Sequence, residues 1–504
     1  MVIWSRSTPI GELLLLVNNM EKDLQDLFKY FDEIYFSFEG GRACYLYTSY
    51  NLFINYSRPP ETKRWPLPQT FGLVGDSKAH QVQWIWFLKD PKDFETFFCQ
   101  FLKKPQELKV LEKMTTKLRV EAMRRLKAIN PEHISTKDLI KEFHFFNEQF
   151  AALGYHAVVL RFIDRGIIAY CSKQYSAEAH DIIHTISLPT RPGFAYQEES
   201  AILALAAKML KKNISIDSKY VQKYLQKIHD AYAWIICGYY NEKPKTIETY
   251  RHALSEALHN NPQEKINERL ASTKMILKEQ KALLASHPDD LKPLARIAGE
   301  AAYLKDYFKF SVNAITYFAE PLFGEISRRS GLAIEVIKDM LPSEIEKVLE
   351  GGVVDLDYVK KRAERHVLIS YTGHIFPLAG EEAELFAARY LVPAESGNEK
   401  EYTGRPASKG KATGRAVIVL SSDDFHKIKE NDIIVVTNTS PDYVPILGKV
   451  AGIIAEEGGI TAHVSVISRE MKIPAVVGLL GITKRLKDGD TVSLDGFTGL
   501  VKIG

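Results

Sequence analysis

The sequence predicts a multidomain α+β protein, in which a large, mainly α-helical N-terminal region precedes a C-terminal β/β/α domain. Three observations support this fold class. The chain has 504 residues, which is more than one ordinary domain holds. Helical periodicity dominates residues 91–391. From residue 403 onward, short apolar runs separated by turn residues predict strands around one short helix.

Residues 1–90 predict a small mixed α/β segment. The apolar pattern indicates a helix at 10–30 and two strands, at 34–38 and 44–48. Between the strands, the diglycine of Glu39–Arg42 predicts a turn. Such a diglycine either cradles a phosphate or only turns the chain, and the turn is the more common use.

Residues 91–391 predict a helical domain, which is also the candidate acceptor-binding region. Apolar spacing indicates helices at 93–102, 105–129, 135–153, 176–186, 198–211, 218–239, 244–285, 294–331 with an interruption at Pro321, 342–349 and 357–365. On the helix at 218–239, His229, Tyr232 and Trp234 have two interpretations, either core packing or an acceptor pocket. The basic run 360–366 favours a solvated helix face over an anion site.

Residues 392–402 are mostly small or polar and contain one Pro and one Gly, which predicts a linker to the domain at 403–504. Within that domain, Val450–Ala455 reads as a buried strand. The next segment contains Gly458 and Gly459, then Thr461 as a candidate N-cap. His463 therefore falls in the first turn of a helix. Residues 473–478 end this helix and start another strand.

The position of His463 suits phosphate chemistry. Free N–H groups and the positive end of the helix dipole meet at a helix N-terminus, where they attract an anion. A neutral imidazole can also attack a phosphoryl group and hold it as a phosphoramidate. A lone histidine at a helix start is more often incidental, so the surrounding sequence decides between these interpretations.

Five segments around His463 resemble, in order, the phosphohistidine swivelling domain of the PEP-utilising enzymes, a family that includes phosphoenolpyruvate synthase, pyruvate phosphate dikinase and rifampicin phosphotransferase. The segments are residues 404–417, 431–442, 456–470, 473–478 and 486–499. The resemblance implies that His463 is the phosphorylated residue. It also implies that Gly458, Gly459, Thr461 and Arg469 are motif residues around the phosphate.

The same resemblance extends, less specifically, to pieces of the helical region, namely residues 224–234, 304–310 and 325–332. In rifampicin-phosphotransferase-like members, such a region lies between an ATP-grasp domain and the histidine domain and binds the acceptor. We expect this chain to lack the family's ATP-grasp and TIM-barrel domains. It contains no G-x-x-x-x-G-K-[ST] loop.

The resemblance therefore implies a phosphotransferase component. His463 would carry a phosphoryl group from a separate ATP-grasp protein, or from PEP, to a small-molecule acceptor. ATP or PEP and Mg²⁺ are expected at the donor site, with no cofactor bound tightly and no metal ligands on this chain. The alternative is a non-enzymatic interaction or sensing module that depends on phosphohistidine.

Composition limits the other possible functions. A net charge of +3, with 45% hydrophobic and 26% charged residues, is typical of a globular protein and gives no case for nucleic acid or membrane partners. Four cysteines lie far apart without metal-ligand spacing, which predicts reduced thiols and a cytoplasmic location. We see neither a signal peptide nor a membrane span.

Overall fold

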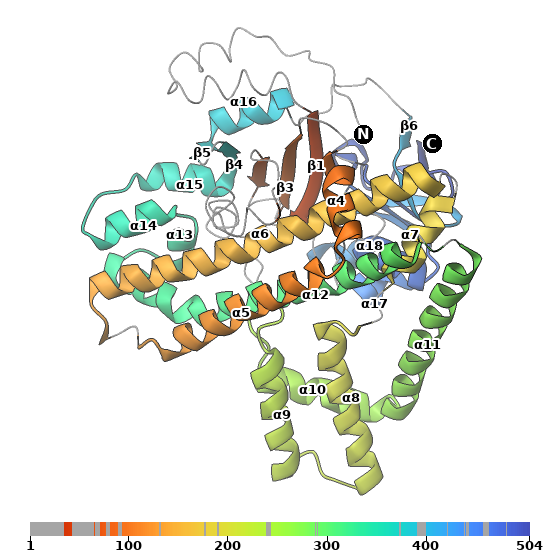
Figure 1. Ribbon diagram of the computed structural model, residues 1–504, viewed down its shortest axis with the longest axis horizontal. Coiled ribbons are helices and arrows are strands. Elements are labelled where there is room, and N and C mark those ends of the chain that lie inside the picture. Colours follow the sequence, from red (N-terminus) through yellow and green to blue (C-terminus); the bar gives the residue numbers. More distant parts are fainter. Residues whose placement is uncertain are drawn as a thin grey trace. The chain divides into compact units, whose positions relative to one another are not determined.

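The computed structural model describes most of the chain from residue 93 onward and parts of the chain before it (Figure 1). The described residues are 35–42, 65, 71–76, 81–88 and 93–504, except 131–132, 176–177, 189–190, 238–242, 288, 290, 372–373, 391–399, 421, 438, 440–442, 457–462 and 480. They form two compact units. The helical unit lies within Cys44–Leu67 and Lys92–Val359, and the sheet unit lies within Met1–Ala43, Pro68–Pro91 and Lys360–Gly504.

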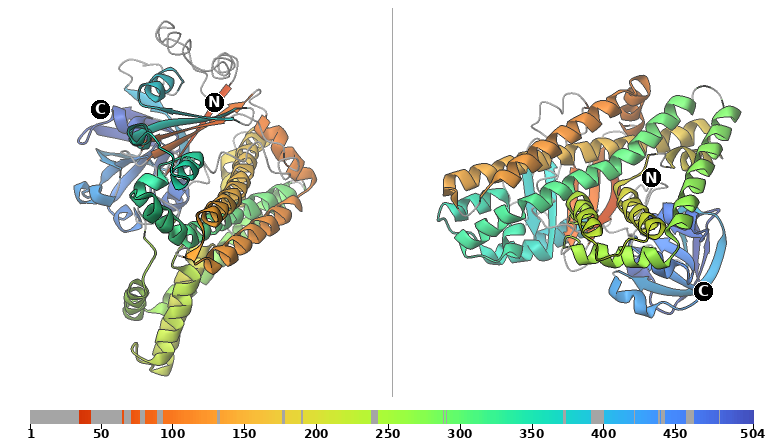
Figure 2. Two further views of the ribbon diagram at one scale, coloured as in Figure 1. Left: turned by 90° about the vertical axis from the view of Figure 1, so that its left-hand side faces the viewer. Right: turned by 90° about the horizontal axis from the view of Figure 1, so that it is seen from below.

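Three long helices form the body of the helical unit. They are α5 (Glu107–Ala128), α6 (Thr136–Tyr175) and α12 (Leu291–Ser330). These helices contact one another and lie side by side (Figures 1 and 2). On α5, the buried residues Leu108, Leu111, Thr115, Ala122 and Leu126 recur at intervals of three to four or their multiples. This spacing places them on one face, which packs against the other two helices. Two shorter helices, α4 (Asp93–Lys103) and α7 (Ala179–Ser187), pack against α6.

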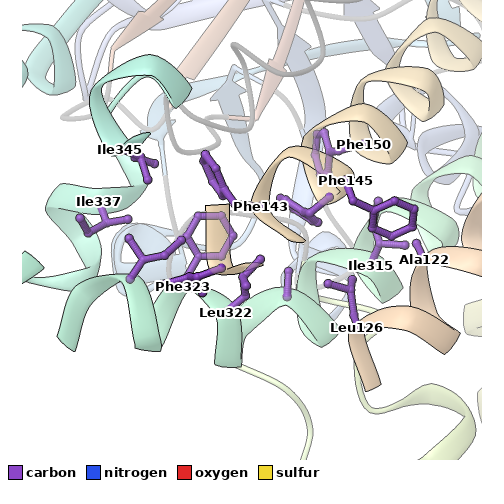
Figure 3. Close-up of a cluster of buried hydrophobic side chains, with 14 of the residues drawn as sticks. Ala122, Leu126, Phe143, Phe145, Phe150, Ile315, Leu322, Phe323, Ile337 and Ile345 are labelled. Carbon is purple, nitrogen blue, oxygen red and sulfur yellow. The ribbon is translucent and has the colours of Figure 1, made fainter. Parts of the chain in front are cut away.

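A cluster of buried hydrophobic side chains, several of them aromatic, fills one end of this body (Figure 3). Phe143 and Phe146 of α6 meet Phe323 of α12 edge to face, with ring centroids 6.2 and 5.6 Å apart. Edge-to-face packing is a favoured geometry for aromatic pairs. Three short helices complete the cluster with apolar residues: α13 (Ile334–Lys338), α14 (Pro342–Leu349) and α15 (Leu356–Glu364).

Helices α8 to α11 form a lobe between α7 and α12 in the sequence. They are α8 (Phe194–Lys212), α9 (Lys219–Tyr232), α10 (Ile247–His259) and α11 (Pro262–Ser286). In Figure 1, α8, α9 and α10 lie below the long helices. Leu203, Leu225 and Leu254 are central to their shared core. The helix predicted over 244–285 is in fact two helices, because Asn261 caps α11 and Pro262 occupies its first turn.

Strands before and after the helical unit in the sequence share one antiparallel sheet. Its order is β1 (Tyr35–Arg42), β3 (Gln81–Leu88), β2 (Phe71–Asp76), β4 (Arg365–Tyr371) and β5 (His374–Ala379). The turn predicted at Glu39–Arg42 is wrong, because these residues continue β1 and pair with Gln81–Trp84 of β3. The helical range predicted to reach residue 391 is interrupted by β4 and β5, and helix resumes only at α16 (Glu381–Tyr390).

The C-terminal domain is built on an eight-stranded sheet. Its order is β6 (Glu401–Thr403), β13 (Leu500–Ile503), β12 (Thr491–Asp495), β8 (Lys411–Val419), β9 (Asp432–Val436), β10 (Val450–Ala455), β11 (Ala475–Val477) and β7 (Arg405–Ser408). Strands β8, β9, β10 and β11 are parallel neighbours. Most of the predicted linker lies outside the described residues, but its last two residues, Glu401 and Tyr402, belong to β6.

Both faces of the parallel strands are buried, as expected for strands covered on two sides. Ile434 and Val436 of β9 belong to one apolar cluster, and Ile433 and Val435 belong to another. Successive strand residues point to opposite faces, so the two clusters lie on opposite sides of the sheet. The first cluster includes Val464 of α18 (His463–Glu470). Within the described part of residues 403–504, α18 is the longest α-helix.

The predicted fold class is confirmed: a large helical region precedes a C-terminal domain of mixed sheet and helix. Two further local predictions were wrong. Pro321 does not interrupt α12, and the next two residues, Leu322 and Phe323, are buried within the same helix. The basic run 360–366 is not a solvated face throughout, because Arg362 and His366 are 1% and 2% exposed.

In the described part of the chain, no helix combines the length and apolarity that crossing a membrane requires.

Candidate functional site

Helix α18 begins at the carboxyl end of a parallel strand. Strand β10 ends at Ala455, the described part of α18 begins at His463, and the chain continues into β11, which is parallel to β10. The helix follows the carboxyl end of β10, and in open α/β sheets this is the edge where ligands bind. His463 is the first described residue of α18, and the sequence predicted it in the first turn of a helix. Gly458, Gly459 and Thr461 lie outside the described residues, so their predicted contribution to phosphate binding stays a prediction.

Buried residues fix α18 against the sheet. Val464, Ser465 and Ser468 are fully buried, and Val464 packs among the apolar side chains of β9 and β10. The hydroxyl of Ser408, on β7, donates a hydrogen bond to the carbonyl of Ser468 at 3.3 Å. The helix ends where Ile473 N–H donates to the same Ser468 carbonyl, with Lys472 in the left-handed conformation. The first turn, which contains His463, therefore sits on a firmly packed helix.

Arg469 lies in the last turn of α18, at the end opposite to His463. Its Nη1 donates to the carbonyl of Ala407 on β7 at 3.3 Å, and burial lowers the pKa of Arg469 to about 10. Six residues of helix separate the two positions by about 9 Å along the axis. The observed contact thus ties the helix to β7, and a phosphate-binding role for Arg469 stays a prediction.

Glu456 is a residue whose role the sequence did not reveal. It follows β10 directly, is 8% exposed, and its backbone N–H donates to Val436 on β9 at 3.0 Å. Its side-chain Oε1 accepts hydrogen bonds from the backbone N–H of Thr483, at 2.8 Å, and from the Thr483 hydroxyl. Thr483 belongs to a short helix, α19 (Ile482–Arg485). The start of the segment that leads to His463 is therefore fixed to two neighbouring elements.

The three acceptor-pocket candidates of the helical region have different surroundings. Trp234 is 6% exposed and packs against Phe310, Tyr317 and Phe318 with ring centroids 5.5–6.1 Å away. His229 lies instead against Tyr250 of α10, at 6.2 Å between ring centroids. Tyr232 is half-buried in the core of the lobe. For Trp234 the core-packing interpretation holds, because the long helix α12 covers its ring.

No set of metal ligands is found in the described part of the chain: three or more His, Cys, Asp or Glu side chains nowhere gather closely enough to hold an ion. The described cysteines Cys99, Cys171 and Cys237 are not in disulfides, and Cys44 lies outside the described residues. Burial raises the pKa of the Cys171 thiol to about 12, which suppresses the reactive thiolate.

Comparison with known proteins agrees with the geometry around His463. Residues 428–499 match the family model "PEP-utilising enzyme, mobile domain". This segment contains β9, β10, α18 and β11.

This segment is therefore similar to the mobile domain of the PEP-utilising enzymes.

The chain is also similar to three archaeal proteins named as probable phosphoenolpyruvate synthases. It is 48% identical to the Pyrococcus abyssi protein over 101 residues, which are 20% of this chain and 12% of that protein. With the Methanothermobacter thermautotrophicus protein, identity is 45% over 126 residues, 25% of this chain and 17% of the relative. With the Archaeoglobus fulgidus protein, identity is 35% over 172 residues, 34% of this chain and 21% of the relative.

These alignments differ in extent. The match to the Archaeoglobus protein covers 172 residues, so it is longer than the segment 403–504 and must include residues before it. The chain nevertheless spans only 12–21% of the length of these three relatives. The part shared with each relative is therefore a minor portion of that relative's length.

Proposed function

We propose that His463 accepts a phosphoryl group and passes it to a small-molecule acceptor. The observation on which this rests is the place of His463: it is the first described residue of α18, inside the segment that matches the mobile domain. The named relatives are phosphoenolpyruvate synthases, which supports phosphoryl transfer involving PEP as the general type of reaction. The helix N-terminus adds free N–H groups and a positive field, which favour a phosphate there.

Transfer takes place in two steps. In the first, a ring nitrogen of neutral His463 attacks the phosphorus, and the bond from phosphorus to the donor's leaving oxygen breaks with its electron pair on that oxygen. In the second, an acceptor oxygen attacks the phosphoramidate. The phosphorus–nitrogen bond then breaks, and its electron pair returns to the imidazole. If the attacking group is a hydroxyl, its proton passes to a base or to water.

The donor site belongs to a partner in this proposal. We expect ATP on a separate ATP-grasp protein, or PEP, to supply the phosphoryl group, and Mg²⁺ to bridge the donor's phosphates. The mobile domain then moves between donor and acceptor sites, as hinged domains do. In the alternative proposal, phosphorylation of His463 selects a binding partner and no acceptor follows. The burial of Trp234 makes its ring less accessible to an acceptor, and the experiments below separate the two proposals.

A labelling experiment tests the first step. The purified chain is incubated with Mg²⁺ and ATP labelled at either the β or the γ phosphate, or with labelled PEP, in each case alone and with candidate ATP-grasp proteins. Acid-labile label is then measured on the chain and on His463→Ala. We expect label that His463→Ala abolishes. If no donor, alone or with any loading protein, labels the chain, or if His463→Ala keeps its label, the proposal is wrong.

The second step separates the two proposals. The labelled chain is isolated and chased with a set of small metabolites bearing hydroxyl or carboxylate groups. Label that leaves the protein and appears covalently on one of these molecules supports the phosphotransferase. Label that stays on His463 while a protein partner binds only the phosphorylated chain supports the interaction module.

A further inference from the structure

A cavity of about 370 Å³ opens between α8 and α10 in the helical lobe. This volume lies within the range of small-molecule sites in proteins. The lining residues come from the two helices and the segments beside them: Ala195, Glu198, Glu199, Ile202, Leu203, Lys245, Thr249, Tyr250, Ala253, Glu256, Ala257, Asn260 and Lys265. The cavity belongs to the lobe alone and includes none of the residues that the sequence predicted for an acceptor pocket.

The buried end of the cavity holds an ion pair. Glu198 of α8 is 7% exposed, and its Oε2 accepts a hydrogen bond from the Lys245 ammonium at 2.6 Å. Its Oε1 accepts from the Tyr250 hydroxyl, also at 2.6 Å. Burial and this hydrogen bond raise the pKa of Tyr250, so the hydroxyl remains a donor. Thr249, Glu256, Asn260 and Lys265 are exposed and form the rim.

Lys245 and Glu198 both line the cavity, and their charged groups still have hydrogen-bonding capacity. An ammonium has three donors and a carboxylate about four acceptor positions, and the described contacts use one and two of them. Since the pair is balanced in charge, a ligand with only a positive or only a negative group would meet one attractive and one repulsive partner. A ligand with adjacent charges of both signs would meet an attractive partner for each.

The cavity wall beyond the ion pair is apolar. Ile202 and Leu203 of α8 and Ala253 and Ala257 of α10 line it. Apolar area removed from water contributes to binding in proportion to that area. A matching ligand therefore has a zwitterionic head and an apolar body.

We propose that this cavity binds a small zwitterion with an apolar body, of which an apolar α-amino acid is the simplest example. The ligand's ammonium group donates to Glu198, its carboxylate accepts from Lys245, and its apolar body lies on Ile202, Leu203, Ala253 and Ala257. Charge-assisted hydrogen bonds of this kind are stronger than neutral ones. The proposal goes beyond phosphoryl transfer, because binding requires neither His463 nor a donor.

Calorimetry on the full chain without any phosphoryl donor tests the ligand class. The probes are L-leucine and L-phenylalanine, with 3-methylbutylamine and 4-methylpentanoate as analogues that lack one charge and 3-methylbutanol as a neutral one. We expect the amino acids to bind at least about tenfold more tightly than any analogue, because each loses a charge-assisted hydrogen bond. Tightest binding of the alcohol, or no binding by any probe, would overturn the proposal.

Charge-altering variants test the residues. Glu198→Gln should shift the preference toward 4-methylpentanoate, and Lys245→Met should shift it toward 3-methylbutylamine, whereas a purely structural pair would weaken all ligands alike. Breaking one side of a buried ion pair can destabilise the fold, so the double variant Glu198→Gln/Lys245→Met is measured as well. It should fold, as judged by circular dichroism, and lose amino-acid binding at least about tenfold. Glu268→Gln, on the exposed side of α11, is the matched control and should bind as the parent does. Unchanged binding by the double variant would refute the assignment.

Discussion

The carboxylate of Glu456 accepts a hydrogen bond from the backbone N–H of Thr483 at 2.8 Å, and a second from the Thr483 hydroxyl. This contact joins the carboxyl end of β10 to the first turn of α19, and Glu456 is the last described residue before the segment that leads to His463. A buried carboxylate that receives two donors is expensive to remove, because both donors are then left without an acceptor. Glu456 therefore fixes the carboxyl end of β10 to α19.

Replacement of Glu456 should loosen this edge of the sheet. We expect Glu456→Ala to increase hydrogen–deuterium exchange at the Thr483 amide by about tenfold or more, from the loss of a charged acceptor. Thr483→Val removes only the hydroxyl and should have a smaller effect, since the backbone N–H keeps its acceptor. Equal exchange in the parent and Glu456→Ala would show that the contact does not hold this edge.

Removal of His463 should separate chemistry from folding. His463→Ala should lose all acid-labile phosphate and keep the circular dichroism and thermal unfolding of the parent, because a residue at the start of a helix contributes little packing. His426→Ala is the matched control, since His426 is an exposed histidine of the same domain. It should retain its phosphate. Loss of label in both variants would instead indicate a general effect on the domain.

Trp234 should behave as a core residue. Its ring packs against Phe310, Tyr317 and Phe318, so Trp234→Ala should lower the free energy of unfolding of the helical unit by about 3–5 kcal/mol. Trp234→Phe keeps an apolar ring and should cost less. Denaturation followed by circular dichroism measures both. A stable Trp234→Ala that fails only in transfer to an acceptor would restore the ligand-contact interpretation.

His156 should make the helical unit sensitive to acid. Its Nδ1 lies 2.9 Å from the Thr115 hydroxyl oxygen, and its Nε2 is buried without a hydrogen-bond partner among the described residues. Burial lowers the pKa of His156 to about 3. In the unfolded chain His156 therefore binds a proton near pH 6.5, whereas in the folded chain it stays neutral until about pH 3.

The sign of the effect follows from this difference. As pH falls from about 6.5 to about 3, the unfolded state gains a proton and the free energy of unfolding decreases by about 1.4 kcal/mol per pH unit from this group. Below pH 3 the folded state is protonated too, and the loss stops. His156→Asn keeps a polar partner for Thr115 but does not titrate, so its unfolding free energy should fall less steeply. Parallel pH profiles for the parent and the variant would contradict the prediction.

Local patterns were predictable wherever neighbours in the sequence are also neighbours in space. The apolar spacing of α5 and the strand–helix–strand order around His463 both follow from repeats within one element or between adjacent ones. The break at Asn261-Pro262 had an equally local signal, an N-cap residue followed by proline. The helical pattern of apolar and charged residues continues on both sides of Asn261-Pro262, so the sequence pattern predicts one helix.

The sequence by itself thus determined the fold class, the histidine helix and the family resemblance of the C-terminal segment, because each depends on short-range order. Only the tertiary structure decided that β2 pairs with β4, although the helical unit separates these two strands in the sequence. It also decided that Pro321 stays inside α12 and that Trp234 lies in the core. It also brought Glu198, Lys245 and Tyr250 together at one cavity. These relationships join residues far apart in the chain, and their energies come from burial and pairing that no local pattern records.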